Sequence, residues 1–173
     1  MSEKNTEKKD VTGISTATNK ADAEMDITTA LLKAAAFKTD EENITEVEIK
    51  RNGEVLFTVN IHPITDGDAR AARRSATTFM KNPNGKNLPL IEKEFNSALF
   101  HSFLIYFATT EEDRKRVWGN KALMVETGAG RPAETIDHVL KMGEKTELVN
   151  LILDLSGMDD EDEEVSMEDF AKN

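Results

Sequence analysis

The segment FNSALFHSFLIYFA, residues 95–108, determines how the rest of the chain must pack. Ten of its fourteen residues are apolar, and it contains four of the eight phenylalanines and the only tyrosine. We predict one helix over residues 91–108, because the apolar side chains recur at helical spacing. They form two stripes, the first of Phe95, Leu99, Phe103 and Tyr106, the second of Phe100, Leu104 and Phe107. A helix that is apolar nearly all round is buried in its own domain or in a partner, so the second stripe is a candidate partner-binding surface.

Upstream of this helix, two segments alternate apolar and polar residues and predict an antiparallel β-hairpin. They are residues 44–49 and 55–61. Asn52-Gly53 between them favours a tight type I′ turn, because both residues tolerate positive φ angles. We expect one face of the hairpin to be buried, and that face carries Val47, Ile49, Val55, Phe57, Val59 and Ile61.

The remaining elements are predicted to be helical. A helix over residues 66–80 follows the hairpin, with Ala69, Ala72, Ala76 and Phe79 on its buried face, and a loop over residues 81–87 comes next. The other predicted helices cover residues 28–38, 110–118, 120–126, 133–142 and 144–155, the last two separated at Gly143. The fold class is therefore α+β, a mainly α-helical domain with an N-terminal antiparallel β-hairpin.

The acidic charge is concentrated at one end of the chain. The net charge is −11, and residues 158–173 hold eight acidic residues against Lys172 alone, which makes −7 of that total. Residues 1–26 are polar and contain almost no large apolar side chain. Neither end can bury enough apolar surface to offset the entropy of ordering. We therefore expect a disordered arm over residues 1–26, a single α+β domain over residues 27–157 and an acidic, disordered tail over residues 158–173.

Several function classes lack the residues that they need. The chain has no cysteine, which excludes disulfides and thiolate chemistry, and its acidic balance argues against binding to a nucleic-acid backbone. No run approaches the ~18 apolar residues of a membrane span. The three histidines lack metal-ligand spacing, and residues 128–133 fit a dinucleotide-binding pattern only without its preceding strand. We therefore predict no catalysis, no cofactor, no metal, and neither a membrane nor a nucleic-acid partner.

Two further groups of residues are candidates for binding a partner. Arg70, Arg73 and Arg74 share one face of the helix predicted over residues 66–80. That face is either solvated and paired with nearby acids, or a docking site for the chain's own acidic tail or for an acidic partner. Beyond the acidic run, three apolar residues either form a short linear anchor or belong to a solvated tail, namely Val165, Met167 and Phe170.

The order of these elements and several short motifs resemble the XkdN-like tail assembly chaperones of phages and phage-derived tail particles. The motifs lie within residues 30–157. They are Leu31-Leu32-Lys33-Ala34, Ile61-His62-Pro63-Ile64-Thr65 with Arg73 and Arg74, Val117-Trp118-Gly119, and residues 142–157, where Gly143-Glu144 is followed by spaced leucines and a closing Leu155-Ser156-Gly157. The sequence departs from the family pattern in its longer first 26 residues, and in Met142, which stands where proline is expected.

The resemblance implies a function and a set of partners. Such proteins bind the long, helical tape measure protein and keep it soluble in the host cytoplasm until tail tube subunits polymerise around it. They are absent from the finished tail. The implied partner is thus the tape measure protein, with the tail tube protein and a second copy of the chain as further candidates. The alternative is a structural component that stays in a phage tail or tail-like particle.

Overall fold

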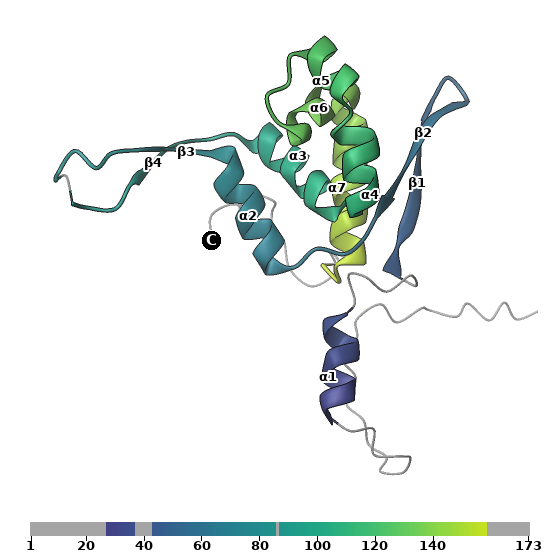
Figure 1. Cartoon of the computed structure of the whole chain (residues 1–173), viewed down its shortest axis with the longest axis horizontal. Helices are drawn as coiled ribbons and strands as arrows, with labels where there is room; N and C mark the ends of the chain where they lie inside the picture. Colours follow the sequence, from purple (N-terminus) through teal and green to yellow (C-terminus); the bar gives the residue numbers. More distant parts are fainter. Residues whose placement is uncertain (1–26, 37–42, 86, 159–173) are drawn as a thin grey trace, which may run out of the picture.

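The computed structural model of the chain describes residues 27–36, 43–85 and 87–158 (Figure 1). Within these ranges the helices are α1 (Ile27–Ala35), α2 (Asp66–Ala76), α3 (Ser97–Ala108), α4 (Glu111–Asp113), a π-helix (Arg114–Trp118), α5 (Lys121–Thr127), α6 (Pro132–Val139) and α7 (Met142–Leu155). The strands form two antiparallel hairpins, β1 (Thr45–Arg51) with β2 (Glu54–Ile61) and β3 (Thr77–Met80) with β4 (Ile91–Phe95).

The prediction of a mainly helical chain with an N-terminal hairpin is confirmed, and the second hairpin is an addition to it. The predicted arm over residues 1–26 and the predicted tail, apart from Met158, lie outside the described residues. The division of the chain into an arm, one domain and a tail therefore stays a prediction.

The first hairpin forms where the sequence predicts it. Asn52 and Gly53 have φ angles of 54° and 82°, the left-handed values that a type I′ turn requires. Three side chains on one face of the hairpin are buried in the core, those of Ile49, Val59 and Ile61. The alternation of apolar and polar residues thus identified the buried face over most of the hairpin's length.

Next to the turn, a β-bulge changes the face of the hairpin to which the side chains of β2 point. The register shifts between Ile49 and Lys50, so that Leu56 is an extra residue in β2 and Val55 lies opposite Lys50. Val55 and Leu56 are consequently exposed. The prediction that Val55 belongs to the buried face is wrong, because one inserted residue moves the side chains beyond it to the other face.

Helix α2 is shorter than predicted. It begins with a capping box, in which Thr65 Oγ1 accepts a hydrogen bond from Asp68 N at 3.3 Å and Asp68 Oδ2 accepts one from Thr65 N at 2.8 Å. It ends at Ala76, and Thr77 begins strand β3 with extended backbone angles. Phe79, predicted on a buried helix face, instead lies on this strand and is exposed. Adjacent β-branched threonines favour a strand over a helix here.

Helix α3 begins later than predicted, because residues 91–95 form strand β4. In the sequence of β4, Ile-Glu-Lys-Glu-Phe, three charged residues separate the two apolar ones, a spacing that also fits a helix, and the strand is set by its pairing with β3. The helix starts after Asn96, whose side-chain oxygen accepts a hydrogen bond from Leu99 N at 2.9 Å. Asn96 N also donates to Ala76 O at 3.0 Å, which closes the base of the second hairpin.

The C-terminal helices follow the prediction, with one shifted boundary. Gly128, with φ at 71°, ends α5, and Pro132 occupies the first turn of α6. The break between α6 and α7 falls at residues 140–141 and not at Gly143, which lies in the first turn of α7. Glu144 Oε2 accepts a hydrogen bond from Lys141 N at 2.7 Å, and this contact sets the start of α7 ahead of the glycine.

Helix α3 is the centre of the core and packs against α2, α6 and α7 (Figure 1). Trp118 of the π-helix is fully buried; its Nε1 donates to Thr109 Oγ1 at 3.0 Å, and its ring meets that of Phe57 edge-on at 5.9 Å between centroids. His62 N donates to Ala108 O at 2.8 Å and so joins the end of β2 to the end of α3. None of the helices in the described ranges is long and apolar enough to cross a membrane.

Candidate functional site

The apolar residues of α3 that the sequence singled out lie mostly inside the protein. Phe100 and Leu104 are 2% and 1% exposed, covered by the surrounding helices. Phe107 is partly buried, and its ring stacks on Phe103 at 6.1 Å between centroids. Both predicted stripes therefore contribute to the core, and Phe100 and Leu104 are inaccessible to a partner in this conformation.

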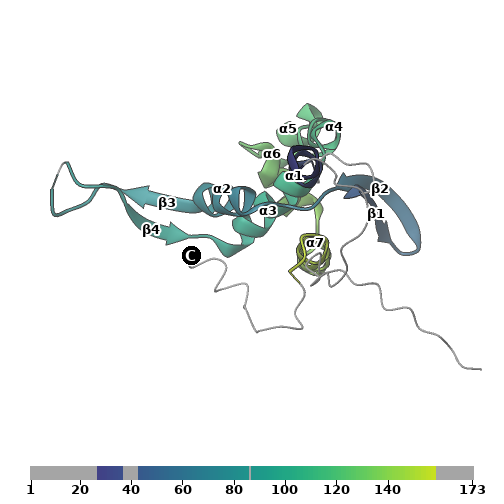
Figure 2. The same cartoon turned by 90° about the horizontal axis from the view of Figure 1, so that it is seen from below.

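The surface instead offers a projecting hairpin, which we call the hairpin arm and define as residues 77–85 and 87–95. Figures 1 and 2 show it extending away from the helices. Its exposed apolar side chains are those of Phe79, Met80, Leu88, Leu90 and Ile91. So many large apolar side chains on one small exposed element are typical of a protein-interaction surface.

The base of the hairpin arm is anchored, whereas none of the described residues covers its outer part. Phe95, the last residue of β4, packs on Phe100 of the core with 5.6 Å between ring centroids. The Arg73 guanidinium of α2 lies over the Phe95 ring at 5.1 Å. The arm therefore has a fixed origin on the helical body, and it holds Phe79 and Leu90, which are 40% and 61% exposed, at the surface.

The hairpin arm was not predicted from the sequence, although its turn contains one signal for a hairpin. Asn84-Gly85 is the same dipeptide type that identified the first hairpin, and Asn84 N donates to Asn82 Oδ1 at 3.0 Å within the connecting turn. The loop was predicted, but the strands on either side were assigned to helices. The residues of β4 do not alternate, because three charged residues separate Ile91 from Phe95, so the dipeptide was not accompanied by a strand pattern on that side.

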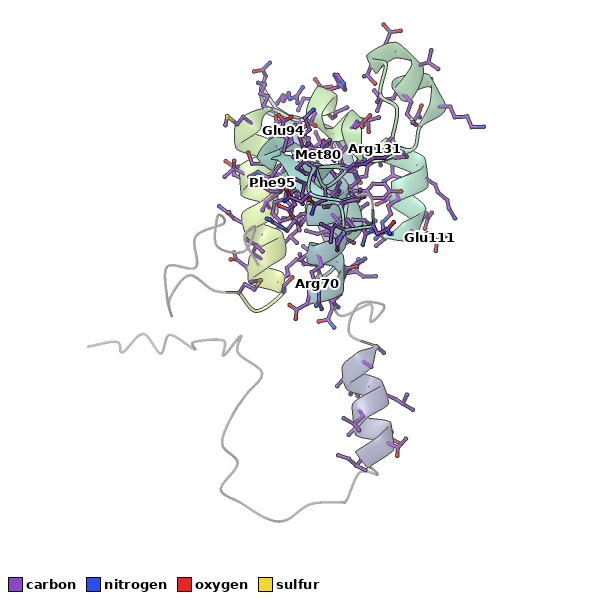
Figure 3. All side chains as sticks on the ribbon, turned by 90° about the vertical axis from the view of Figure 1, so that its left-hand side faces the viewer. Arg70, Met80, Glu94, Phe95, Glu111 and Arg131 are labelled. Atoms are coloured by element: carbon purple, nitrogen blue, oxygen red, sulfur yellow. The ribbon has the colours of Figure 1, made fainter. Side chains whose placement is uncertain are left out.

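Beside the hairpin arm lies a second feature, which we call the arginine groove. Its volume is about 500 Å³, and it is lined by Arg70, Arg73, Arg74, Thr77, Phe79, Leu90 and Glu92. The structure thus brings the three predicted arginines together with two exposed apolar residues of the arm. Arg73 Nη2 pairs with Glu92 Oε2 at 3.3 Å, while Arg70 and Arg74 are exposed. Figure 3 labels Arg70 on α2.

Helix α1 presents a third apolar surface. It has no buried residue, and Figure 1 shows it apart from the other helices. Ile27, Leu31 and Leu32 are all exposed. An amphipathic helix whose apolar face has no cover among the described residues is suited to packing on another protein.

One polar cluster, in which Ser102 and Lys145 are buried and Asp137 is exposed, resembles a catalytic constellation and joins residues that lie far apart in the sequence. Ser102 Oγ donates to Asp137 Oδ1 at 2.8 Å, and Lys145 Nζ hydrogen-bonds to the same carboxylate and to Ala98 O at 2.9 Å. Burial lowers the pKa of the adjacent His101, and the Lys145 charge lowers it further. Ser102 is fully buried, so no substrate reaches its hydroxyl, and the cluster instead links α3 to α6 and α7.

The other predicted features are distributed as follows. Val165, Met167 and Phe170 lie outside the described residues. Residues 128–133 form a turn and the start of α6, not a dinucleotide-binding unit. Within the described part of the chain, no group of three histidine or acidic side chains could hold a metal ion.

Comparison with known proteins adds a family. A family model described as "Phage XkdN-like tail assembly chaperone protein, TAC" matches residues 28–171. The chain has no match among curated proteins. Among solved structures it is similar to one described as the crystal structure of the protein yqbn, with 20% sequence identity and a TM-score of 0.40, over 68% of this chain and 88% of that one.

Proposed function

The chain belongs to the XkdN-like phage tail assembly chaperone family, and from this premise we propose that it binds the tape measure protein and keeps it soluble while the tail assembles. A chaperone role follows from the family, which is not known as a family of enzymes. Our proposal adds three points to this role: the client is the tape measure protein, the chain acts in the host cytoplasm, and it is released before the tail is complete.

The hairpin arm is the observation that supports this proposal. A long helical client exposes apolar stripes until the tube encloses it, and these stripes aggregate unless another apolar surface covers them. The arm offers such a surface outside the core, with Phe79, Met80 and Leu90 exposed. The client can therefore bind there without any rearrangement of α3.

Helix α1 supports the same proposal as a second, separate contact. Leu31 and Leu32 belong to the motif by which the sequence resembles the family, and both are exposed. Two small apolar contacts joined by one chain bind more tightly together than either does alone. Each remains weak by itself, so that tube subunits can displace the chaperone stepwise during polymerisation.

Co-expression with the tape measure protein of the same particle tests the proposal. The soluble fraction of that protein should rise with the wild-type chain and fall back with the double variant Phe79→Ser and Leu90→Ser. Val125→Ser with Met142→Ser is the matched control, because both residues are exposed and lie away from the arm. If the wild-type chain leaves the soluble fraction of the tape measure protein unchanged, the proposed function is wrong. If the wild-type chain and the arm variant raise that fraction equally, the chaperone role stands but the arm is not the contact.

Mass spectrometry of purified particles separates a chaperone from a structural component. A chaperone is absent from finished tails or present far below one copy per tail subunit. Stoichiometric presence would show instead that the chain is a structural component of the tail, which is the alternative that the sequence analysis left open.

A further inference from the structure

The arginine groove carries positive charge that the described residues do not balance. Of its three arginines, Arg73 pairs with Glu92, while Arg70 and Arg74 form no ion pair with the described residues. Arg70 Nε donates only to the backbone oxygen of Asp66, at 3.3 Å. The groove therefore combines two exposed, unpaired cations with the apolar surfaces of Phe79 and Leu90, which is the lining that an acidic segment containing apolar residues would fit.

The chain itself contains such a segment. Residues 159–173 carry eight acidic residues and one lysine, a net charge of −7. The acidic run over residues 159–164 is followed by three apolar side chains at close spacing, those of Val165, Met167 and Phe170. Charge and apolar content thus both complement the groove.

The helix that precedes this segment, α7, ends next to the start of α2. Ser156, immediately after α7, accepts a hydrogen bond at its Oγ from Ile64 N at 2.9 Å, and Ile64 precedes the cap of α2. Arg74 lies about 12 Å along the helix from Asp66, at roughly 1.5 Å per residue. The seven residues from Met158 to Val165 span up to about 23 Å when extended, so the tail can reach the whole groove without moving any helix.

A second cationic concavity fits this tail less well. It is lined in part by Arg114, Lys115 and Lys121. Arg114 already donates to two backbone oxygens at the end of α3, and Lys115 pairs with Glu111 at 2.6 Å. Only Lys121 is left for a new anionic partner, and none of the exposed large apolar residues lines this surface.

We propose that residues 159–173 dock in the arginine groove of the same chain, with acidic side chains beside Arg70 and Arg74 and apolar side chains against Phe79 and Leu90. The docked tail covers part of the hairpin arm and thereby limits its contact with other copies of the chain, and a client that binds the arm displaces the tail. This inference concerns the chain alone and is independent of the identity of any client.

The absence of cysteine allows a direct test. A spin label on Ser166→Cys in the full-length, ¹⁵N-labelled protein should weaken the amide signals of α2 and of the hairpin arm. The variant Arg70→Glu with Arg74→Glu should restore those signals, while Lys121→Glu with Lys141→Glu, an equal change of charge elsewhere, should leave them weak. Raising NaCl to roughly 0.5 M, where the screening length falls to about 4 Å, should also restore most of the signal.

Three results would overturn the proposal. Amide signals of α2 and the arm that keep their full intensity in the spin-labelled wild-type chain would mean that the tail leaves the groove open. An open groove would remain available to an acidic partner protein. Equal weakening when the label is on a separate, ¹⁴N copy would show docking between two chains. Unchanged weakening in the Arg70→Glu, Arg74→Glu variant, with the Trp118 indole signal confirming its fold, would show that the tail binds elsewhere.

Discussion

Replacing Glu144 by glutamine should destabilise the fold by about 1–2 kcal/mol at neutral pH. The Glu144 carboxylate accepts hydrogen bonds from Arg51 Nε and Nη2, both at 2.8 Å, and from Lys141 N at 2.7 Å. Arg51 Nη2 also donates to Val139 O at 2.6 Å. This one ion pair therefore ties strand β1 to the end of α6 and the start of α7.

The magnitude follows from the pKa of the carboxyl group. The hydrogen bonds from Arg51, aided by that from Lys141 and opposed by burial, lower the pKa of Glu144 from 4.5 to about 2. Such a change corresponds to at most about 3 kcal/mol of stability. The Arg51 and Glu144 side chains are 30% and 19% exposed, so solvent screening makes the loss of stability smaller than this upper limit. Glutamine also retains part of the hydrogen bonding.

Urea unfolding followed by the fluorescence of Trp118, the only tryptophan, measures the loss. The pKa of Glu144 is lower in the folded state than in the unfolded state. The carboxylate therefore contributes its full share to the free energy of unfolding above pH 4.5, and this share disappears as the pH falls through about 2. The difference between wild type and Glu144→Gln should shrink over the same range.

Glu111→Gln is the matched control for this ion pair. It removes a pair with Lys115 whose two side chains are 80% and 76% exposed, and solvent screening should make its effect on the free energy of unfolding much smaller than that of Glu144→Gln. A Glu144→Gln variant as stable as the control at pH 7, or an unfolding difference that persists undiminished at pH 2, would refute this reasoning.

Three further changes have defined outcomes. Leu104→Asp places a charge in the core and should abolish the cooperative thermal transition seen by circular dichroism, whereas the exposed Val125→Asp should leave it intact. Deleting residues 159–173 should shift Tm by less than about 4 °C, since a surface contact is worth ~1 kcal/mol or less; a larger fall would place the tail in the core. Gly53→Ala, at a φ of 82°, should cost about 1 kcal/mol in urea unfolding, while Gly143→Ala in a helix should cost nothing.

Local patterns in the sequence were sufficient for elements that local forces define. The first hairpin has alternating residues and a turn dipeptide, and Asn52 and Gly53 adopt the angles that this turn needs. The family motif Gly143-Glu144 also has a local reason, because Glu144 caps the first turn of α7 through Lys141 N. Its second role, pairing with Arg51, joins residues 93 positions apart and could not be seen in the sequence.

The hairpin arm could not be predicted in the same way, because two helical patterns run directly into it. The alanines that define α2 continue in register to Phe79, and Ile91 and Phe95 continue the apolar spacing of α3 backwards. Pairing between β3 and β4 overrides both patterns, since each strand satisfies its backbone groups only through the other. The Ser102–Asp137 contact likewise depends on tertiary packing, because its partners are 35 positions apart in the sequence.

The burial of α3 also decides which residues can meet a client at low cost. Exposing Phe100 and Leu104 would forfeit roughly 1.5–3 kcal/mol of apolar burial for each side chain, before any disruption of the neighbouring helices. The same kinds of side chain, Phe79 and Leu90, already lie exposed on the hairpin arm. If binding required α3 to be exposed, the free energy of that opening would be subtracted from the binding free energy each time a client bound. A chaperone that releases its client binds it weakly, so a large subtraction would leave too little affinity. The abundance of apolar residues in α3 therefore accounts for the stability of the scaffold, and the less apolar arm beside it is where binding is expected.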